Sequence, residues 1–312
     1  MNYIIFDLEW NQGVSHGEKR DKKLPLEIVE IGAVKLNEER EMIGEFSQLI
    51  KPQIYHEMHS ITRKIIHIQM EELEKGRLFT EVMPEFLEWC GEDSLFCTWG
   101  TLDLLELQRN MDYYHMKPLC DRPIKYYDIQ KLFSLAYEDG KSRRTLEYAI
   151  DLLCVKKDIP FHRAFSDAYY TAKVFDKIED PLVLEKFSFD TFIVPDCKEH
   201  EINIVFSDYA KHISRTFPDK KKLFEAKDIS TPVCYKCKKR ISKRIKWFSP
   251  NGKHYYALGY CLRHGYMKSK IRIRKAENGE IYTVTTHRLI TKEEKKLLAE
   301  KRDEIIKKKK QN

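Results

Sequence analysis

The sequence predicts an α/β protein in which helices flank a mixed β-sheet, followed by a small basic domain. Three strand-like segments open the chain, and helical patterns alternating with a further strand come after them, an order typical of an α/β layer architecture. Charge also divides the chain. Residues 1–185 hold 24 Lys and Arg against 34 Asp and Glu, a net −10, whereas residues 186–312 hold 32 against 15, a net +17.

The strand-like segments are rich in β-branched and aromatic residues. They span residues 3–9, 27–36 and 42–51, and the run LFCTW at 95–99 adds a fourth. The segment NQGVSHGEKRDKKLP between the first two is too rich in charge and glycine to pack, so we expect a loop there. The apolar residues recur with a helical period at 79–90, 102–114, 128–137, 145–154 and 164–178.

We expect the first domain to cover residues 1–180. Residues 181–201 contain two prolines and no sustained period, which indicates a linker or packing arm. The basic domain is expected over 202–290, where the turn ENGE at 277–280 joins two hairpin strands. Residues 291–312 begin with a Thr-x-x-Glu capping signal and predict an exposed basic helix or tail.

The composition favours a folded, cytoplasmic protein. Hydrophobic residues make up 42% of the chain and aromatic residues 12%. We expect no membrane association, because no apolar stretch approaches the length of a membrane span and the first residues lack the pattern of a signal peptide. In the cytoplasm, the eight cysteines are expected to be thiols or metal ligands.

Two acids interrupt the first apolar strand, YIIFDLEW. Asp7 and Glu9 lie two residues apart, so strand alternation points both side chains to one face. Like charges in that position repel, and burying either one without a partner is costly. Taken alone, the stretch is compatible with a solvated strand end or with a metal site.

Later segments supply partners for these acids. Asp103 follows the CTWG segment, and His162 and Asp167 lie in FHRAFSDA. A carboxylate in the first turn of a helix also complements the helix dipole, so either aspartate taken alone has a structural explanation. Together, however, the carboxylates fall at strand faces and strand-to-helix junctions, where α/β folds place functional groups.

Four converging carboxylates favour hard cations, which selects Mg²⁺ or Mn²⁺ over zinc. A pair of such ions can clamp the attacking and leaving oxygens of a phosphodiester displacement. A histidine at the rim suits removal of the proton from the attacking water. The combined pattern therefore predicts a metal-dependent phosphodiesterase site.

The three segments FDLEW, CTWGTLD and HRAFSDA resemble the motifs of the DEDDh 3′-to-5′ exonuclease superfamily, which has a ribonuclease-H-like fold and includes ribonuclease T and the proofreading subunits. Within that superfamily, EIVEIGAVKL, HSIT, FTEVMPEFLEWC and W-G-x-x-D are similar to the branch of histone-mRNA 3′ exonuclease and the KapD-like proteins. The resemblance covers about residues 1–180.

The resemblance implies a two-metal 3′-to-5′ exonuclease. We expect it to act on single-stranded 3′ ends, with RNA favoured over DNA. It implies that Asp7, Glu9, Asp103 and Asp167 hold two Mg²⁺ or Mn²⁺ ions and that His162 is the general base. The stretch after the first acids continues as WNQG, where many relatives have small or hydroxyl residues, so the resemblance does not settle sugar recognition. The candidates for contact with the terminal nucleotide are Trp10, Asn11, His59 and Ile61; Trp10 and His59 could equally be core residues.

Two ligand pairs with the spacing of zinc knuckles lie in the basic half. The pairs Cys234-x2-Cys237 and Cys261-x2-His264 are separated by a strand-turn-strand signal, KWFSPNGKHYYAL, which is typical of a zinc ribbon. Four closed ligands predict one structural Zn²⁺; free thiols are the alternative. Cys197 or His254 could replace one member of the set.

Basic and aromatic residues alternate around the ribbon. Basic side chains neutralise phosphates and aromatic rings can stack on unpaired bases, so we expect single-stranded nucleic acid to bind here. Trp247 has a second explanation, as part of a small ribbon core. The candidate contacts are Lys243, Arg244, Arg272 and Arg274.

Two other functions remain compatible with the sequence. The first is a catalytically silent module that holds RNA 3′ ends; an intact acid set argues against it, because a binding module has no need of groups that repel phosphate. The second is an adaptor that uses the basic half to dock on a ribosome, ribonucleoprotein or protein partner.

Overall fold

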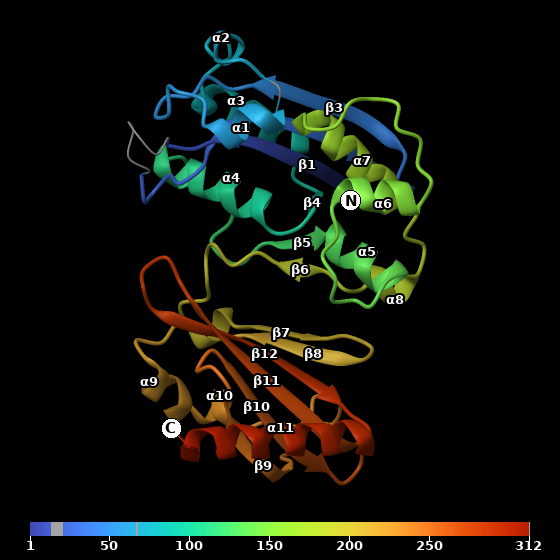
Figure 1. Cartoon of the computed structure of the whole chain (residues 1–312), viewed down its shortest axis with the longest axis vertical. Helices are drawn as coiled ribbons and strands as arrows, with labels where there is room; N and C mark the ends of the chain where they lie inside the picture. The colour runs from blue at the N-terminus through green and yellow to red at the C-terminus, as the bar shows by residue number, and fades with distance from the viewer. Residues whose placement is uncertain (14–20, 67, 312) are drawn as a thin grey trace. The chain divides into compact units, whose positions relative to one another are not determined.

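The structure, a computed structural model, describes residues 1–13, 21–66 and 68–311, without the side chains of residues 61, 65 and 309–311. The chain forms two compact units, Met1–Phe192 and Ile193–Asn312 (Figure 1). None of the helices within the described ranges is long and apolar enough to cross a membrane.

A six-stranded mixed sheet with the order β3-β2-β1-β4-β5-β6 forms the centre of the first unit. The first three strands pair antiparallel, β4 runs parallel to both β1 and β5, and β6 pairs antiparallel with β5. This arrangement confirms the predicted α/β class with a mixed sheet. The strands are β1 (Asn2–Asn11), β2 (Glu27–Leu36), β3 (Met42–Leu49), β4 (Ser94–Thr98), β5 (Lys125–Asp128) and β6 (Ser188–Phe189).

Helices cover both faces of this sheet. One apolar cluster joins α5, α6 and α7 to Ile5 of β1, and a second joins α3 and α4 to Ile4, Phe6 and Leu8 of the same strand. Alternation along β1 therefore leaves Asp7 and Glu9 on the α7 side. The helices are α1 (Ser60–Ile66), α2 (Met70–Leu73), α3 (Phe79–Cys90), α4 (Leu102–Tyr113), α5 (Ile129–Tyr137), α6 (Leu146–Leu152), α7 (Ala164–Asp176) and α8 (Pro181–Leu184).

The segment predicted as a linker, 181–201, divides between the two units. Asp180 caps α8 by accepting a hydrogen bond from the backbone N–H of Leu182, and β6 adds an edge strand to β5 through Ser188 and Phe189. The first unit consequently ends at Phe192, beyond the predicted boundary at 180. Backbone pairing of a two-residue strand leaves no periodic signal, so the sequence pattern did not reveal it.

The second unit is built on an antiparallel sheet with the order β7-β8-β12-β11-β10-β9. The predicted ribbon is present as β9 and β10, but it is part of this larger sheet. The elements are η1 (Lys198–His200), β7 (Ile202–Val205), β8 (Tyr209–Ile213), α9 (Lys220–Glu225), α10 (Lys227–Ser230), β9 (Ser242–Phe248), β10 (His254–Cys261), β11 (Gly265–Lys275), β12 (Ile281–Leu289) and α11 (Lys292–Gln311).

Helices also cover both faces of the second sheet. Helix α11, predicted as an exposed helix or tail, packs Leu298 against Ile245 and Leu258 on one face. Helices α9 and α10 pack on the other face, around Ile271. Leu298 is 4% exposed, so α11 is an integral part of the unit; its weak apolar stripe among many lysines explains why it was predicted to be exposed.

Candidate active site and candidate zinc site

Asp7 and Glu9 lie on the central strand of the first sheet, where β1 pairs with β2. Asp7 stands opposite Gly32 and Glu9 opposite Glu30. Both acids are partly buried. Apolar residues on the other face hold the backbone of the strand in place, so both acidic side chains leave it on the same face.

The start of α7 brings a third carboxylate to the pair. The helix crosses β2 at Gly32 so closely that a Cβ there would lie 1.9 Å from the backbone nitrogen of Phe165. Asp167 stands in the first turn of this helix. Carboxylate oxygens of Asp7, Glu9 and Asp167 lie within 4.8 Å of one another, a grouping that can hold a cation.

Asp103 reaches the same region from α4. It lies in the first turn of that helix, is 5% exposed, and accepts a hydrogen bond from the backbone N–H of Leu8. Its charge contributes to raising the pKa values of Asp7 and Glu9, so it belongs to the same electrostatic cluster although its oxygens stand outside the closest group of three.

Without cations, the buried carboxylates repel one another, which disfavours their ionised forms. Burial raises the pKa of Glu9 to about 8, with the charges of Asp167 and Glu30 adding to the effect. Burial likewise raises the pKa of Asp103 to about 7 and that of Asp167 to about 6. The pKa of Asp7 is raised by burial and by Asp103 and Glu9. Divalent cations would remove this penalty by supplying the opposite charge.

An ion pair between the half-exposed Arg163 and the buried Glu30 fixes the entry into α7. Arg163 donates to both carboxylate oxygens of Glu30, at 3.0 Å and 3.2 Å from Nε and 2.8 Å from Nη2. The backbone N–H of Ala164 donates to Glu30 as well, at 3.2 Å. Glu30 is 1% exposed and lies next to Glu9 in the sheet. We did not predict this pair, which positions the start of α7. The signal that could have revealed it is the acidic residue Glu30 within the apolar run EIVEIG.

His162 lies just before α7 on the solvent side. The residue is exposed, and its backbone N–H donates to Asp167 over 3.4 Å. Its φ of 65° is in the left-handed region, which is uncommon for a residue with a side chain and often occurs at functional sites.

The candidate nucleotide contacts differ in their surroundings. Asn11 is fully buried; its side-chain amide donates to the carbonyls of Tyr55 and Glu57 and accepts from the backbone N–H of His59, and its contact with a nucleotide stays a prediction. Its amide therefore positions the segment before α1. This role depends on residues 55–59, which are far from Asn11 in the sequence.

The other candidates lie around the same segment. His59 is partly buried, with Nδ1 3.1 Å from Nε2 of Gln12. Trp10 packs against the apolar cluster of α3 and α4. Ile61 lies in α1, but its side chain is outside the described residues. Contacts of Trp10, His59 and Ile61 with a nucleotide stay predictions.

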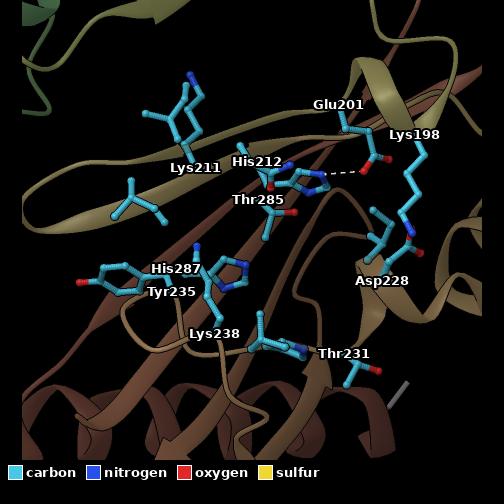
Figure 2. Close-up of a pocket in the computed structure, with 17 residues that line it drawn as sticks. Lys198, Glu201, Lys211, His212, Asp228, Thr231, Tyr235, Lys238, Thr285 and His287 are labelled. Carbon is cyan, nitrogen blue, oxygen red and sulfur yellow. Dashed lines mark hydrogen bonds and ion pairs between the residues drawn. The ribbon is translucent and has the colours of Figure 1, made fainter. Parts of the chain in front are cut away.

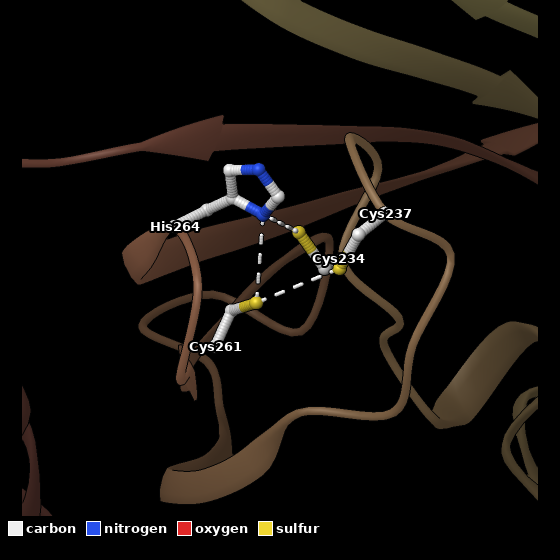
Figure 3. Close-up of side chains that lie close together, drawn as sticks. All are labelled: Cys234, Cys237, Cys261 and His264. Carbon is white, nitrogen blue, oxygen red and sulfur yellow. Dashed lines mark hydrogen bonds between the residues drawn. The ribbon is translucent and has the colours of Figure 1, made fainter.

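The second unit brings together the four predicted zinc ligands (Figure 3). Cys234 Sγ and Cys261 Sγ lie 3.5 Å and 3.6 Å from His264 Nδ1, and Cys237 Sγ lies 3.7 Å from Cys261 Sγ. Tetrahedral bonds of about 2.3 Å to sulfur and 2.0–2.1 Å to nitrogen require edges of about 3.8 Å between sulfurs and 3.6 Å between sulfur and nitrogen. The donor set thus fits zinc.

The charge state of Cys261 is consistent with that fit, whereas burial raises the pKa of the Cys234 thiol. Burial acts to raise the pKa of Cys261, but hydrogen bonds from the backbone of Arg263 and from His264 outweigh it and lower the pKa to about 6. A thiolate is the form that binds a metal. Neither Cys197 nor His254 belongs to this group; Cys197 lies with Asp196 and His200 in a separate one.

The predicted nucleic-acid contacts of the second unit are exposed on its surface. Lys243 and Arg244 lie on β9, and Arg272 and Arg274 alternate along β11 so that they share one face. Trp247 is a core residue: it packs with α9 and α10, and its Nε1 donates to the carbonyl of Ser230 at 2.8 Å.

Known proteins are similar mainly to the first unit. Residues 4–175 match the family described as Exonuclease (RNase T). A PolC-type DNA polymerase III of Thermotoga maritima is 33% identical over 153 residues, 48% of this chain and 10% of that protein, and its Thermotoga petrophila counterpart is 32% identical over the same share. The chain thus spans about a tenth of the length of these curated relatives.

Solved structures with a similar fold include two nucleases. The nuclease domain of 3′hExo, a DEDDh family member bound to rAMP, has a TM-score of 0.49 at 17% identity, covering 61% of this chain and 96% of that one. E. coli exonuclease I in complex with a dA16 oligonucleotide has a TM-score of 0.45 at 12% identity, covering 68% and 54%.

Proposed function

We propose that this chain, which belongs to the exonuclease family, removes nucleoside monophosphates one at a time from the 3′ ends of single-stranded nucleic acid. The family confirms the predicted nuclease class. The 3′-to-5′ direction, the preference for RNA over DNA and the assignment to the KapD-like branch are parts of the proposal.

The observation that carries the proposal is the buried acidic cluster on β1, α4 and α7. Three carboxylates have oxygens within 4.8 Å of one another, and Asp103 lies beside them. Burial and mutual repulsion raise the pKa values of these groups, so protons or cations are needed to stabilise the cluster. We propose two Mg²⁺ or Mn²⁺ ions held by Asp7, Glu9, Asp103 and Asp167. Bound there, such ions stabilise the charge that develops on the phosphate and acidify the attacking water.

The chain's own residues would then position and deprotonate the reactants. The exposed His162, at the strained entry to α7, would accept the proton of the attacking water at its imidazole ring. Glu30 and Arg163 would hold α7 in the register that keeps Asp167 opposite Asp7. The packed face of β1 would keep Asp7 and Glu9 in place while substrate enters and product leaves.

The second unit would hold the substrate strand. Its half of the chain carries a net +17, and the four predicted contacts are exposed. We propose that Lys243, Arg244, Arg272 and Arg274 contact phosphates without sequence preference. The Cys3His site would hold one structural Zn²⁺ that ties the loop before β9 to the β10–β11 turn.

The proposal is tested with one oligonucleotide sequence made as 5′-labelled RNA and as DNA, each with Mg²⁺ and with Mn²⁺. We expect ladders that shorten from the 3′ end, faster on RNA, and a loss of at least about 100-fold for Asp7→Asn. Asp112→Asn, which removes an exposed acid of α4, is the matched control and should cleave normally.

Equal activity of wild type and Asp7→Asn would refute the catalytic assignment. Release of the labelled 5′ nucleotide first would refute the direction. Tight binding of the oligonucleotides without turnover in either metal would instead favour the silent binding module.

A further inference from the structure

The second unit contains a pocket of about 240 Å³, and none of the four Cys3His residues is among those that line it. Figure 2 shows the lining residues. It lies between the strands β7, β8 and β12 on one side and α10 with the segment 231–238 on the other. The pocket is lined entirely by residues of this unit. None of the functions assigned above uses it.

Two polar groups on β12 line the pocket without filling their hydrogen-bonding capacity. Thr285 is 2% exposed, and its hydroxyl has no hydrogen-bond partner in the described part of the chain. His287 is fixed through Nδ1, which lies 2.8 Å from the hydroxyl of Ser269. Its Nε2 has no recorded partner among the described residues. Buried polar groups are normally paired, so the Thr285 hydroxyl calls for a partner, and His287 Nε2 offers a second polar atom on the same strand.

The lining of the pocket combines apolar and basic side chains. Ala210, Ile229 and Val233 contribute apolar surface. Lys198, Lys211 and Lys238 also line the pocket.

The two carboxylates of the pocket are already engaged. Glu201 accepts from Arg215 at 2.6 Å and lies 3.0 Å from Nε2 of His212. Asp228 accepts from Arg215 at 3.0 Å and lies 3.8 Å from Lys198 Nζ. Arg215, which does not line the pocket, pairs with both acids, and the three lysines of the lining outnumber its two carboxylates; this positive balance suits an anionic ligand.

We propose that this pocket binds one nucleotide, with the base against the apolar side chains, the polar edge of the base at Thr285 and His287, and the phosphate at the lysines. A flat heteroaromatic ring with donors and acceptors on its edge suits apolar side chains together with a hydroxyl and an imidazole. The volume is about eight times the roughly 30 Å³ share of one water, more than a lone phosphate needs. The nucleotide is either a free nucleoside monophosphate or one unpaired nucleotide of a strand.

The inference rests on the chemistry of the pocket and does not require hydrolysis. It is therefore tested in the full-length Asp7→Asn chain, in which the strand is not degraded. Calorimetry would measure the binding of the four nucleoside monophosphates, adenosine, inorganic phosphate and a five-residue RNA. Substitution Thr285→Val removes the hydroxyl at constant shape, and Thr286→Val, on the opposite face of β12, is the matched control.

We expect Thr285→Val to weaken nucleotide binding about fivefold or more, the loss of one hydrogen bond, and Thr286→Val to leave it within about twofold. Adenosine should bind at least about tenfold more weakly than AMP at low salt, and Lys198→Gln should reduce that difference. Without ligand, Thr285→Val should unfold at the same or a higher temperature, because no native hydrogen bond is lost; a structural role for the hydroxyl would lower it.

The outcomes separate the sources of the nucleotide. Thr285-dependent binding of monophosphates identifies free nucleotides, and Thr285-dependent binding of the RNA alone identifies a nucleotide within a strand. Equal affinities of Thr285→Val and the parent for every ligand overturn the proposal. Inorganic phosphate binding as tightly as the monophosphates also overturns it, because the base would then contribute nothing.

Discussion

Replacing Gly32 by alanine tests whether the close approach of α7 to β2 builds the acidic site. A Cβ at this position would lie 1.9 Å from the nitrogen of Phe165 and 2.1 Å from the carbonyl carbon of Ala164, whereas ordinary contact begins at 3.4 Å. Both neighbours are backbone atoms, so no side chain can turn aside. Helix α7, and Asp167 with it, must move by about 1.5 Å.

A displacement of about 1 Å at a catalytic group can reduce the rate about 100-fold, so we expect a loss of that size for Gly32→Ala. The overpacking should also lower the free energy of unfolding by about 1–3 kcal/mol. The rate is measured on 5′-labelled RNA with Mg²⁺ or Mn²⁺, and the stability by urea unfolding.

Gly44→Ala is the matched control, because it adds the same methyl group to the same sheet. Its Cβ would lie 3.5 Å from the ring of Trp89, an ordinary contact, and we expect a rate within about twofold of wild type. A variant Gly32→Ala that cleaves at the wild-type rate would refute the reasoning, whatever its stability. If it unfolds cooperatively but cleaves slowly, displacement of Asp167 is supported over loss of the fold.

Two further predictions concern the metals. Because the pKa values of Glu9, Asp103 and Asp167 are raised to about 8, 7 and 6, the folded chain without Mg²⁺ holds more protons than the unfolded chain, and its stability should fall as pH rises from about 4 to 8. A fixed Mg²⁺ concentration should therefore raise the melting temperature more at pH 8 than at pH 6. The extra rise should be about 2–4 °C for each kcal/mol by which Mg²⁺ stabilises the chain more at pH 8. Equal rises at the two pH values would contradict this, as would an equally large extra rise at pH 8 in Asp7→Asn. In the second unit, Cys261→Ser should reduce the zinc content from about one ion per chain to none and lower the melting temperature, whereas Cys197→Ala should keep the ion; zinc measured by atomic emission at equal levels in both variants would show that Cys261 is not a ligand.

The acidic site was largely predictable because it depends on local rules. Alternation along one strand places Asp7 and Glu9 on one face, and the start of a helix places Asp167 in its first turn. The same residues also form an ordered set of motifs. Asn11 could not be assigned in this way, since an amide that follows two acids can meet a ligand or the chain itself. Only the course of residues 55–59 shows that it is buried.

The pair Glu30–Arg163 was missed for a related reason. Neither residue belongs to a recognisable spacing, and the contact joins positions 133 residues apart. The extent of the second sheet was also missed, because β7 and β8 are only four and five residues long. Such strands are stabilised by their neighbours rather than by their own pattern. The four residues of the candidate zinc site, by contrast, have a recognisable spacing, and the structure brings them together as predicted.

The link between Glu30 and the entry to α7 also bears on when activity arises during synthesis. Strands β1 and β2 leave the ribosome long before Arg163 and Asp167 do, so Asp7 and Glu9 are at first without Asp167 beside them. Contacts of such long sequence separation form late in folding. A nascent chain would therefore display Asp7 and Glu9 but lack the complete acidic cluster until nearly the whole first unit had emerged.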